Sequence, residues 1–340
     1  MKKILVLEVI VLIALVIFGA VLLAKENSTP TEPAGTTVTT EPSTEPSAEP
    51  TPEPTTEPTT PAWATIPQDR LITAAQYFVY DLNANQYLAA TGSGKTQVYP
   101  ASITKIYSAY LALQHLDPED LVGVGSELNM VAAGSSVAHI KKGAKLTVSK
   151  LVEGMMLPSG NDASHTLAAA AGRVISGKAD MGGQTAVKTF VQYMNDMNEK
   201  LGLTGSHWVN PDGIHKEQHY TTFDDLVTIA RLVLKEDTIM EYAVTVEEKF
   251  HNGEELYTWE NTNLLVHPES QYYCPYAIGL KTGQTPRAGS CLLSAFDYEG
   301  RTIVVGVFGC PEPEDRFADT LQLFSAAVGY TGDGNASVIG

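Results

Sequence analysis

Cysteine is scarce in this chain of 340 residues, which contains only Cys274, Cys291 and Cys310. No two of them form a C-x-x-C pair, which argues against a structural zinc site. The odd number argues against a full disulfide framework, although one bridge could form in an extracellular domain. Histidines near polar motifs, such as His165 and His219, lack the spacing of zinc ligands. We therefore expect no metal and no cofactor, structural or surface roles for the histidines, and a small buried role for Cys291.

Basic residues are also few. The chain has 22 Lys and Arg against 39 Asp and Glu, so its formal net charge is −17 at pH 7. Proteins that bind nucleic acid need a basic surface for the phosphates. The charge therefore argues against nucleic acid as a partner and suits a solvated surface that faces outward.

Long hydrophobic runs are limited to one, the twenty residues from Ile4 to Leu23, which Glu8 alone interrupts. As a helix this run spans roughly 30 Å, the thickness of a bilayer core. Lys2 and Lys3 favour a cytoplasmic N-terminus, so the rest of the chain lies outside. A cleaved signal peptide is the alternative, although its apolar region is usually shorter. We expect residues 1–25 to be a membrane anchor or signal segment and the remainder to be extracytoplasmic, or secreted if the segment is cleaved.

Hydrophobic periodicity is absent from residues 26–62, a tract of Thr, Glu, Pro and Ser in which Glu-Pro recurs. This composition cannot bury a core. Repeated prolines favour extended polyproline II, and the like charges of the glutamates stiffen it. We expect a stalk or linker that holds the next domain away from a membrane. Ordered sequence resumes at residue 63, so we expect one domain over residues 63–330 and a tail over 331–340.

The remaining sequence predicts one α+β domain. Strands are predicted from alternating β-branched and aromatic residues at 74–81, 86–90, 277–282, 289–297 and 301–308. Helices are predicted from helically spaced apolar residues between Ser102 and Asp117 and over 147–157, 162–175, 184–201, 222–235 and 316–328. Because strands lie at both ends of the domain, we expect the first and last strands to close the sheet.

Residues 92–96, Gly-Ser-Gly-Lys-Thr, resemble the end of a phosphate-binding loop. The first glycine of that motif would fall at Ala89, and Pro100 interrupts the helix that should begin at Lys95. We therefore expect a hairpin loop there.

Three short polar motifs carry the chemistry. Ser102 and Lys105 are three residues apart, so a helix would place them on one face. A serine hydroxyl is a weak nucleophile until a base takes its proton, and a neutral lysine amine can be that base. Burial or nearby positive charge must first lower the pKa of the lysine. Ser159-Gly-Asn161 follows in a turn between predicted helices, and Lys281-Thr-Gly283 lies on a predicted strand.

The ordered set Ser-x-x-Lys, Ser-x-Asn and Lys-Thr-Gly is typical of penicillin-binding proteins and β-lactamases. With its flanking residues, the chain resembles the low-molecular-mass penicillin-binding proteins, specifically the serine D-Ala-D-Ala carboxypeptidases of the peptidase S11 type. The resemblance is carried by Tyr99-Pro-Ala-Ser-Ile-Thr-Lys105, Leu157-Pro-Ser-Gly-Asn-Asp-Ala163, Ser206-His-Trp-Val-Asn-Pro-Asp-Gly213, Gly279-Leu-Lys-Thr-Gly283 and Ala288-Gly289.

This resemblance implies the fold and the substrates. The fold of the family is an antiparallel sheet with helices on both faces and an all-helical subregion. The implied substrates are peptidoglycan stem peptides that end in D-Ala-D-Ala, and β-lactam antibiotics would acylate the enzyme. The implied location is the extracytoplasmic face of a bacterial cell membrane.

The resemblance also implies catalytic roles for four side chains. Ser102 would attack the carbonyl of the penultimate D-Ala while Lys105 removes its proton. Ser159 and Lys281 would help to pass a proton to the leaving amine. The positive charge of Lys281 would also help to keep Lys105 neutral.

The implied substrate-binding residues lie on the same two motifs. Asn161 would bind the substrate amide and Thr282 the terminal carboxylate. The backbone N–H of Gln284, with that of the serine, would form the oxyanion hole. Gly283 would let the substrate backbone approach the strand closely. Arg287 is a candidate for assisting with the carboxylate.

Three other functions remain open at this point. A D,D-endopeptidase that cuts cross-links uses the same site. A class A β-lactamase needs an additional glutamate to activate water, for which Glu260 is the only candidate in a suggestive setting. A penicillin sensor would stay acylated, but the short segment before the hydrophobic run offers no signalling domain.

Overall fold

The computed structural model describes residues 71–329 of the chain. The predicted segments 1–25, 26–62 and 331–340 therefore lie outside the described residues. Within residues 71–329, no helix combines the length and the apolar character needed to cross a bilayer.

A five-stranded antiparallel sheet has the strand order β2-β1-β11-β10-β9. Its strands are β1 (Gln76–Asp81), β2 (Gln86–Ala90), β9 (Ala277–Thr285), β10 (Gly289–Tyr298) and β11 (Arg301–Cys310). β1 pairs with β11 along its whole length, from Gln76 opposite Phe308 to Asp81 opposite Ile303. The predicted pairing of the first strand with the last is confirmed, and it leaves β9 at one edge of the sheet.

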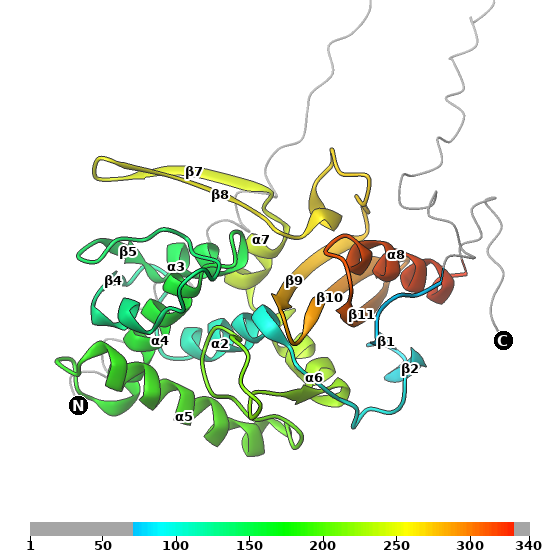
Figure 1. Ribbon diagram of the computed structural model, residues 1–340, viewed down its shortest axis with the longest axis horizontal. Helices are drawn as coiled ribbons and strands as arrows, with labels where there is room; N and C mark the ends of the chain where they lie inside the picture. Colours follow the sequence, from blue (N-terminus) through cyan, green and yellow to red (C-terminus); the bar gives the residue numbers. More distant parts are fainter. Residues whose placement is uncertain (1–70, 330–340) are drawn as a thin grey trace, which may run out of the picture. The chain divides into compact units, whose positions relative to one another are not determined.

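One face of the sheet is covered by α8 (Asp315–Ala327), as Figure 1 shows. Because side chains alternate along a strand, Leu292 and Phe296 of β10 face this helix, whereas Leu293 faces the other side. Phe296 stacks on Phe324 of α8 with 4.1 Å between the ring centroids. This apolar layer fixes α8 against the sheet.

The opposite face of the sheet packs against α2 (Thr104–Leu113) and α6 (Phe223–Val233). Phe78 of β1 contacts Phe223 of α6, with 5.0 Å between their ring centroids. Helix α2 is buried over most of its length because it also contacts the helical region on its far side. Its first turn, which carries Lys105, and the 3₁₀ turn directly before it, which carries Ser102, are therefore held between the sheet and the helices.

The helical region contains α3 (Val148–Met156), α4 (Asn161–Ser176) and α5 (Gly183–Leu201). Thr147 caps α3 by accepting a hydrogen bond from the backbone N–H of Lys150 at 3.1 Å. Helices α4 and α5 pack so closely at Gly172 that a Cβ there would clash with the backbone of Ala186. The predicted α+β architecture, with helices on both sheet faces and an all-helical subregion, is confirmed.

Several short elements were not predicted. They are α7 (Asp237–Val244), the two-stranded pairs β3–β6 (Gln97–Val98, Thr221–Thr222), β4–β5 (Leu121–Gly123, Lys145–Thr147) and β7–β8 (Glu247–Asn252, Glu255–Glu260), and the 3₁₀ helices η2 (Ala101–Ile103), η3 (Ser126–Met130) and η4 (Leu264–Val266). In Figure 1 the hairpin β7–β8 projects beyond the helical region. Its strands are mostly polar, and one aromatic cluster holds them, with 4.7 Å between the ring centroids of Phe250 and Trp259.

Two smaller predictions can be compared with the structure. Residues 92–96 form a loop between β2 and β3, and Lys95 lies 3.4 Å from Asp224. The predicted hairpin is wrong, because β2 pairs with β1 and β3 pairs with β6. The three cysteines, Cys274, Cys291 and Cys310, are buried free thiols. The bridge that the sequence left open is therefore absent among the described residues.

Candidate active site

Ser102 lies in η2, directly before α2. Ala101 precedes it with φ +48°, a left-handed conformation that is unfavourable for a residue with a side chain. Two glycines approach this peptide. A Cβ at Gly283 would lie 3.0 Å from the backbone nitrogen of Ser102, and a Cβ at Gly213 would clash with the carbonyl of Ala101. Glycine is therefore needed where a strand and a loop contact the backbone of Ser102.

Lys105 lies one turn later and is fully buried. Its Nζ donates hydrogen bonds to Ser102 Oγ at 2.8 Å, to Asn161 Oδ1 at 2.6 Å and to the carbonyl of Asp212 at 2.8 Å. Burial lowers the pKa of Lys105 to about 8, although the negative charges of Asp212 and Asp162 oppose the shift. The structure thus places a weakly basic amine against the serine hydroxyl.

The first wall of the site is the turn between α3 and α4. Asn161 is the first residue of α4, and its side chain reaches Lys105. Ser159 has φ +59°, and Gly160 fits only without a side chain, so the turn is tight. Ser159 is buried in this turn, and among the described residues it makes no hydrogen bond to Ser102 or Lys105. Of the two polar residues of this motif, Asn161 therefore contacts Lys105 and Ser159 does not.

The second wall is the edge strand β9. Lys281 is buried, and its Nζ donates to Thr282 Oγ1 at 3.4 Å. Burial, followed by the positive charges of Lys105 and a nearby arginine, lowers the pKa of Lys281 well below its usual value. Thr282 Oγ1 lies 2.6 Å from Thr262 Oγ1. Gln284 is exposed at the end of this wall.

The arginine behind this wall is Arg316 of α8, which the sequence analysis missed. Its Nη1 donates to the carbonyl of Gly283 at 3.4 Å, and burial lowers the pKa of Arg316. Arg287, the candidate from the sequence, lines a separate hollow with Gln97 and Phe308 instead. The sequence around Arg316, an acidic first turn of a helix, gives no signal that this side chain reaches β9.

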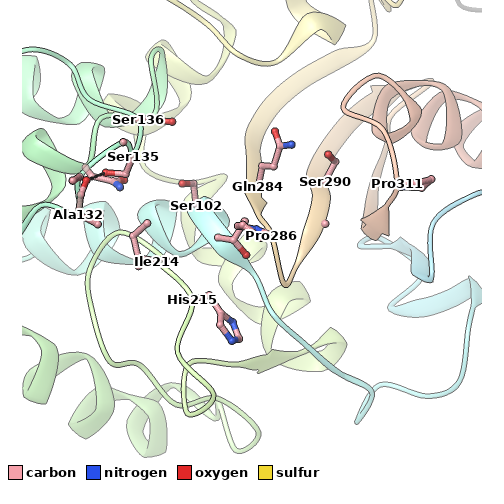
Figure 2. Close-up of a pocket in the computed structure, with 16 residues that line it drawn as sticks. Ser102, Ala132, Ser135, Ser136, Ile214, His215, Gln284, Pro286, Ser290 and Pro311 are labelled. Atoms are coloured by element: carbon pink, nitrogen blue, oxygen red, sulfur yellow. Dashed lines mark hydrogen bonds between the residues drawn. The ribbon is translucent and has the colours of Figure 1, made fainter.

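A groove of about 690 Å³ opens over Ser102. Figure 2 shows Ser102 between the loop that carries Ser135 and Ser136 and the end of β9 that carries Gln284. Of the predicted site residues, three line the groove, namely Ser102, Asn161 and Gln284. Side chains of Asp, Glu, Lys and Arg are absent from the residues that line it. The lining of the groove therefore carries no acidic, lysine or arginine side chain and mixes polar with apolar residues, which suits an extended peptide that binds through its amides.

His219, for which the sequence predicted a structural or surface role, is linked by hydrogen bonds to the peptide before Ser102. His219 is buried, and its Nδ1 accepts a hydrogen bond from the backbone N–H of Val209 at 3.1 Å. Its Nε2 lies 2.8 Å from Thr104 Oγ1, which in turn donates to the carbonyl of Ala101 at 2.8 Å. Burial lowers the pKa of His219 to about 4, so the ring is neutral at neutral pH. This chain of hydrogen bonds holds the peptide before Ser102.

Comparison with known proteins agrees with this geometry. The sequence profile of the D-alanyl-D-alanine carboxypeptidase family matches residues 63–311. DacF of Bacillus subtilis, a D-alanyl-D-alanine carboxypeptidase, is 29% identical over 253 residues, which are 73% of this chain and 58% of that protein. A D-alanyl-D-alanine carboxypeptidase of Streptomyces sp. is 32% identical over 247 residues, which are 69% of this chain and 80% of that protein.

Solved structures show the same fold. The crystal structure of the Streptomyces K15 DD-transpeptidase matches with a TM-score of 0.67 at 28% identity, and the match covers 75% of this chain and 97% of that one. The chain therefore spans nearly the whole of this structure but less than two thirds of the Bacillus relative. From the profile match over most of its length, the chain belongs to the D-alanyl-D-alanine carboxypeptidase family.

Proposed function

We propose that this chain is a serine D,D-carboxypeptidase that removes the terminal D-Ala of peptidoglycan stem peptides through an acyl-enzyme on Ser102. The observation that carries the proposal is the 2.8 Å contact between Lys105 Nζ and Ser102 Oγ beneath the groove. A base at hydrogen-bond distance from a serine hydroxyl is what nucleophilic catalysis needs. The substrate class follows from the activity for which the family and the two relatives are named.

Acylation begins when neutral Lys105 takes the proton of Ser102 while Oγ attacks the carbonyl carbon of the penultimate D-Ala. The carbonyl oxygen takes up negative charge and is bound by the backbone N–H groups of Ser102 and Gln284. The C–N bond then breaks, and the proton that Lys105 took from Ser102 passes through Ser159 and Lys281 to the amine of the leaving D-Ala, which leaves Lys105 neutral again. With the pKa of Lys105 at about 8, roughly a tenth of the amine is neutral at pH 7, so the base is available.

Substrate binding and deacylation use the remaining predicted residues. Asn161 binds the substrate amide, and Thr282 binds the terminal carboxylate. Gly283 lets the substrate backbone lie against the edge of β9. Water then attacks the acyl ester, the Ser102 oxygen leaves with a proton, and the shortened peptide is released.

The same serine would be acylated by β-lactam antibiotics, whose amide carbonyl can occupy the position of the peptide carbonyl. We place the reaction outside a bacterial cell membrane, on a catalytic domain of residues 63–330. The support for this location is the sequence of residues 1–25, proposed as an anchor or signal segment, and of 26–62, proposed as a stalk. Residues 331–340 are proposed as a tail.

The test is release of D-Ala from diacetyl-Lys-D-Ala-D-Ala by the full-length protein. We expect release by the wild-type protein and none by Ser102→Ala. Cleavage of cross-linked dimers in place of the tripeptide would identify a D,D-endopeptidase. Rapid turnover of penicillin would identify a β-lactamase, but Glu260, the candidate water-activating residue, does not line the groove. Failure of all three reactions would contradict the proposed function.

A further inference from the structure

Two buried side chains behind Lys105 have no part in the proposed reaction. His165 of α4 and Asp212 of the loop before β6 are 3% and 2% exposed. The Nε2 atom of His165 lies 3.1 Å from Oδ2 of Asp212. Burying a carboxylate is costly unless it is hydrogen-bonded, and His165 is the side chain that pairs with Asp212 here.

Asp212 connects this pair to the reacting atoms. Its backbone carbonyl accepts hydrogen bonds from Lys105 Nζ at 2.8 Å and from Ser102 Oγ at 3.5 Å. Its side-chain Oδ1 accepts from the backbone N–H of Ile214 at 3.1 Å. One residue therefore aligns the serine and the lysine and also places a carboxylate close to the amine.

The position of the proton on the pair follows from the partners of each nitrogen. His165 Nδ1 is buried without a hydrogen-bond partner among the described residues. A proton on Nδ1 would be a buried donor with no acceptor, which is costly. The proton therefore sits on Nε2 and is donated to Asp212. Burial would raise the pKa of Asp212, but the hydrogen bond from His165, the charge of Lys105 and the backbone N–H of Ile214 lower it. The pair thus carries one negative charge.

The loop does not depend on His165 for its position. The carbonyl of Pro211 accepts hydrogen bonds from Ser108 of α2 and from Ser164 of α4, each at 2.8 Å. Gly213 N–H donates to Asn210 Oδ1 at 2.8 Å. Because these contacts fix the backbone on both sides of Asp212, the charge of the pair can be changed while the loop stays in place.

We propose that His165 and Asp212 form a positioning pair that holds one shielded negative charge behind Lys105 and thereby sets how readily this amine accepts the proton of Ser102. The inference rests on the proposed function and deepens it. The negative charge makes the amine a stronger base, and the hydrogen bond from His165 disperses part of that charge, so the ammonium form is stabilised less than it would be by a bare carboxylate. The other titratable groups that face the pair or Lys105 are Asp162 of α4, Lys281 of β9 and His219 of the loop, and His219 is in turn faced by His207 and His215.

The direct test is an NMR titration of Lys105 in the full-length protein labelled with ¹³Cε-lysine, with the signal identified by its loss in Lys105→Met. Asp212→Asn should move the midpoint of Lys105 to lower pH by about one to two units, because it removes one nearby negative charge. His165→Leu should move it to higher pH, and His165→Gln, which retains an N–H donor, should leave it in place. In Asp212→Asn, adding His165→Leu should have no further effect, because His165 acts through the carboxylate.

Asp81→Asn is the matched control. Asp81 is equally buried, accepts backbone N–H groups on Oδ1 and binds Arg301 on Oδ2, but it lies on β1 away from the groove. A midpoint unchanged in both Asp212→Asn and His165→Leu would overturn the inference, as would the same shift in Asp81→Asn. The pH at which acylation by a fluorescent penicillin reaches half its maximal rate should move with the NMR midpoint. If the wild-type protein is not acylated, the proposed function fails. The NMR titration still shows whether His165 and Asp212 set the midpoint of Lys105.

Discussion

Gly283 of β9 lies against the backbone of Ser102 so closely that a Cβ at residue 283 would be 3.0 Å from the Ser102 nitrogen. That nitrogen carries one of the two N–H groups proposed to stabilise the oxyanion. The edge of the sheet and η2 are therefore in contact at the point where the negative charge would develop. The distance between them sets the geometry of the site.

Gly283→Ala should slow acylation of Ser102 by about tenfold to a hundredfold, because the added methyl group pushes β9 away from η2 and lengthens the oxyanion contacts. The measurement is the second-order rate of labelling by a fluorescent penicillin. Gly123→Ala is the control, since a Cβ there would meet no atom within 4 Å. An equal rate in Gly283→Ala and wild type would show that this contact does not control the site.

The acylation rate should depend on pH through Lys105. The neutral amine is the active form, and burial lowers the pKa of Lys105 to about 8. The rate should therefore rise about tenfold per pH unit below pH 8 and level off above it. Penicillin labelling measured from pH 5 to pH 10 checks this. A rate that is flat between pH 6 and pH 9 would contradict the role of Lys105 as the base.

Replacing His219 should damage the site although the ring touches no reacting atom. His219→Ala leaves the backbone N–H of Val209 and the hydroxyl of Thr104 without their partner. We expect a loss of about 1–3 kcal/mol in the free energy of unfolding and a slower acylation, because the peptide before Ser102 loses its support. Thermal unfolding and penicillin labelling measure the two effects. The exposed His251, replaced by Ala, should change neither, and wild-type behaviour of His219→Ala would refute the proposed support.

Arg316→Leu should lower kcat/KM for the D-Ala-D-Ala peptide by about tenfold, since it removes a buried positive charge and the hydrogen bond to the Gly283 carbonyl. The pKa of Lys281 should rise in this variant, because the charge of Arg316 helps to lower it. Arg287→Leu is the matched control and should behave as wild type, because Arg287 lines a different hollow. Equal losses in both variants would mean that general surface charge is responsible.

The sequence predicted those parts of the site in which residues close together in the chain are also in contact. A separation of three residues on a helix brings Lys105 to Ser102, and one strand carries Lys281, Thr282 and Gly283 in succession. The main strands and helices were predicted because their apolar residues keep a clear period over five or more residues. The pairing of β1 with β11 followed from the general closure of sheets by terminal strands.

The contacts that could not be predicted join residues far apart in the chain. The carbonyl of Asp212 is 107 positions away from Lys105, and Arg316 is 33 positions away from Gly283. Backbone carbonyls carry no signal in a sequence, and a lone arginine in an acidic turn resembles any surface residue. The hairpin β7–β8 was missed because its mostly polar strands have only a few aromatic residues.

The most direct test of the account is identification of the residue that penicillin modifies. The full-length protein is incubated with benzylpenicillin, digested and examined by mass spectrometry. We expect the covalent adduct on the peptide that contains Ser102, and its complete loss in Ser102→Ala, with the folded state verified by circular dichroism. An adduct on another residue, or an adduct that persists in Ser102→Ala, would contradict the assignment of Ser102 as the nucleophile.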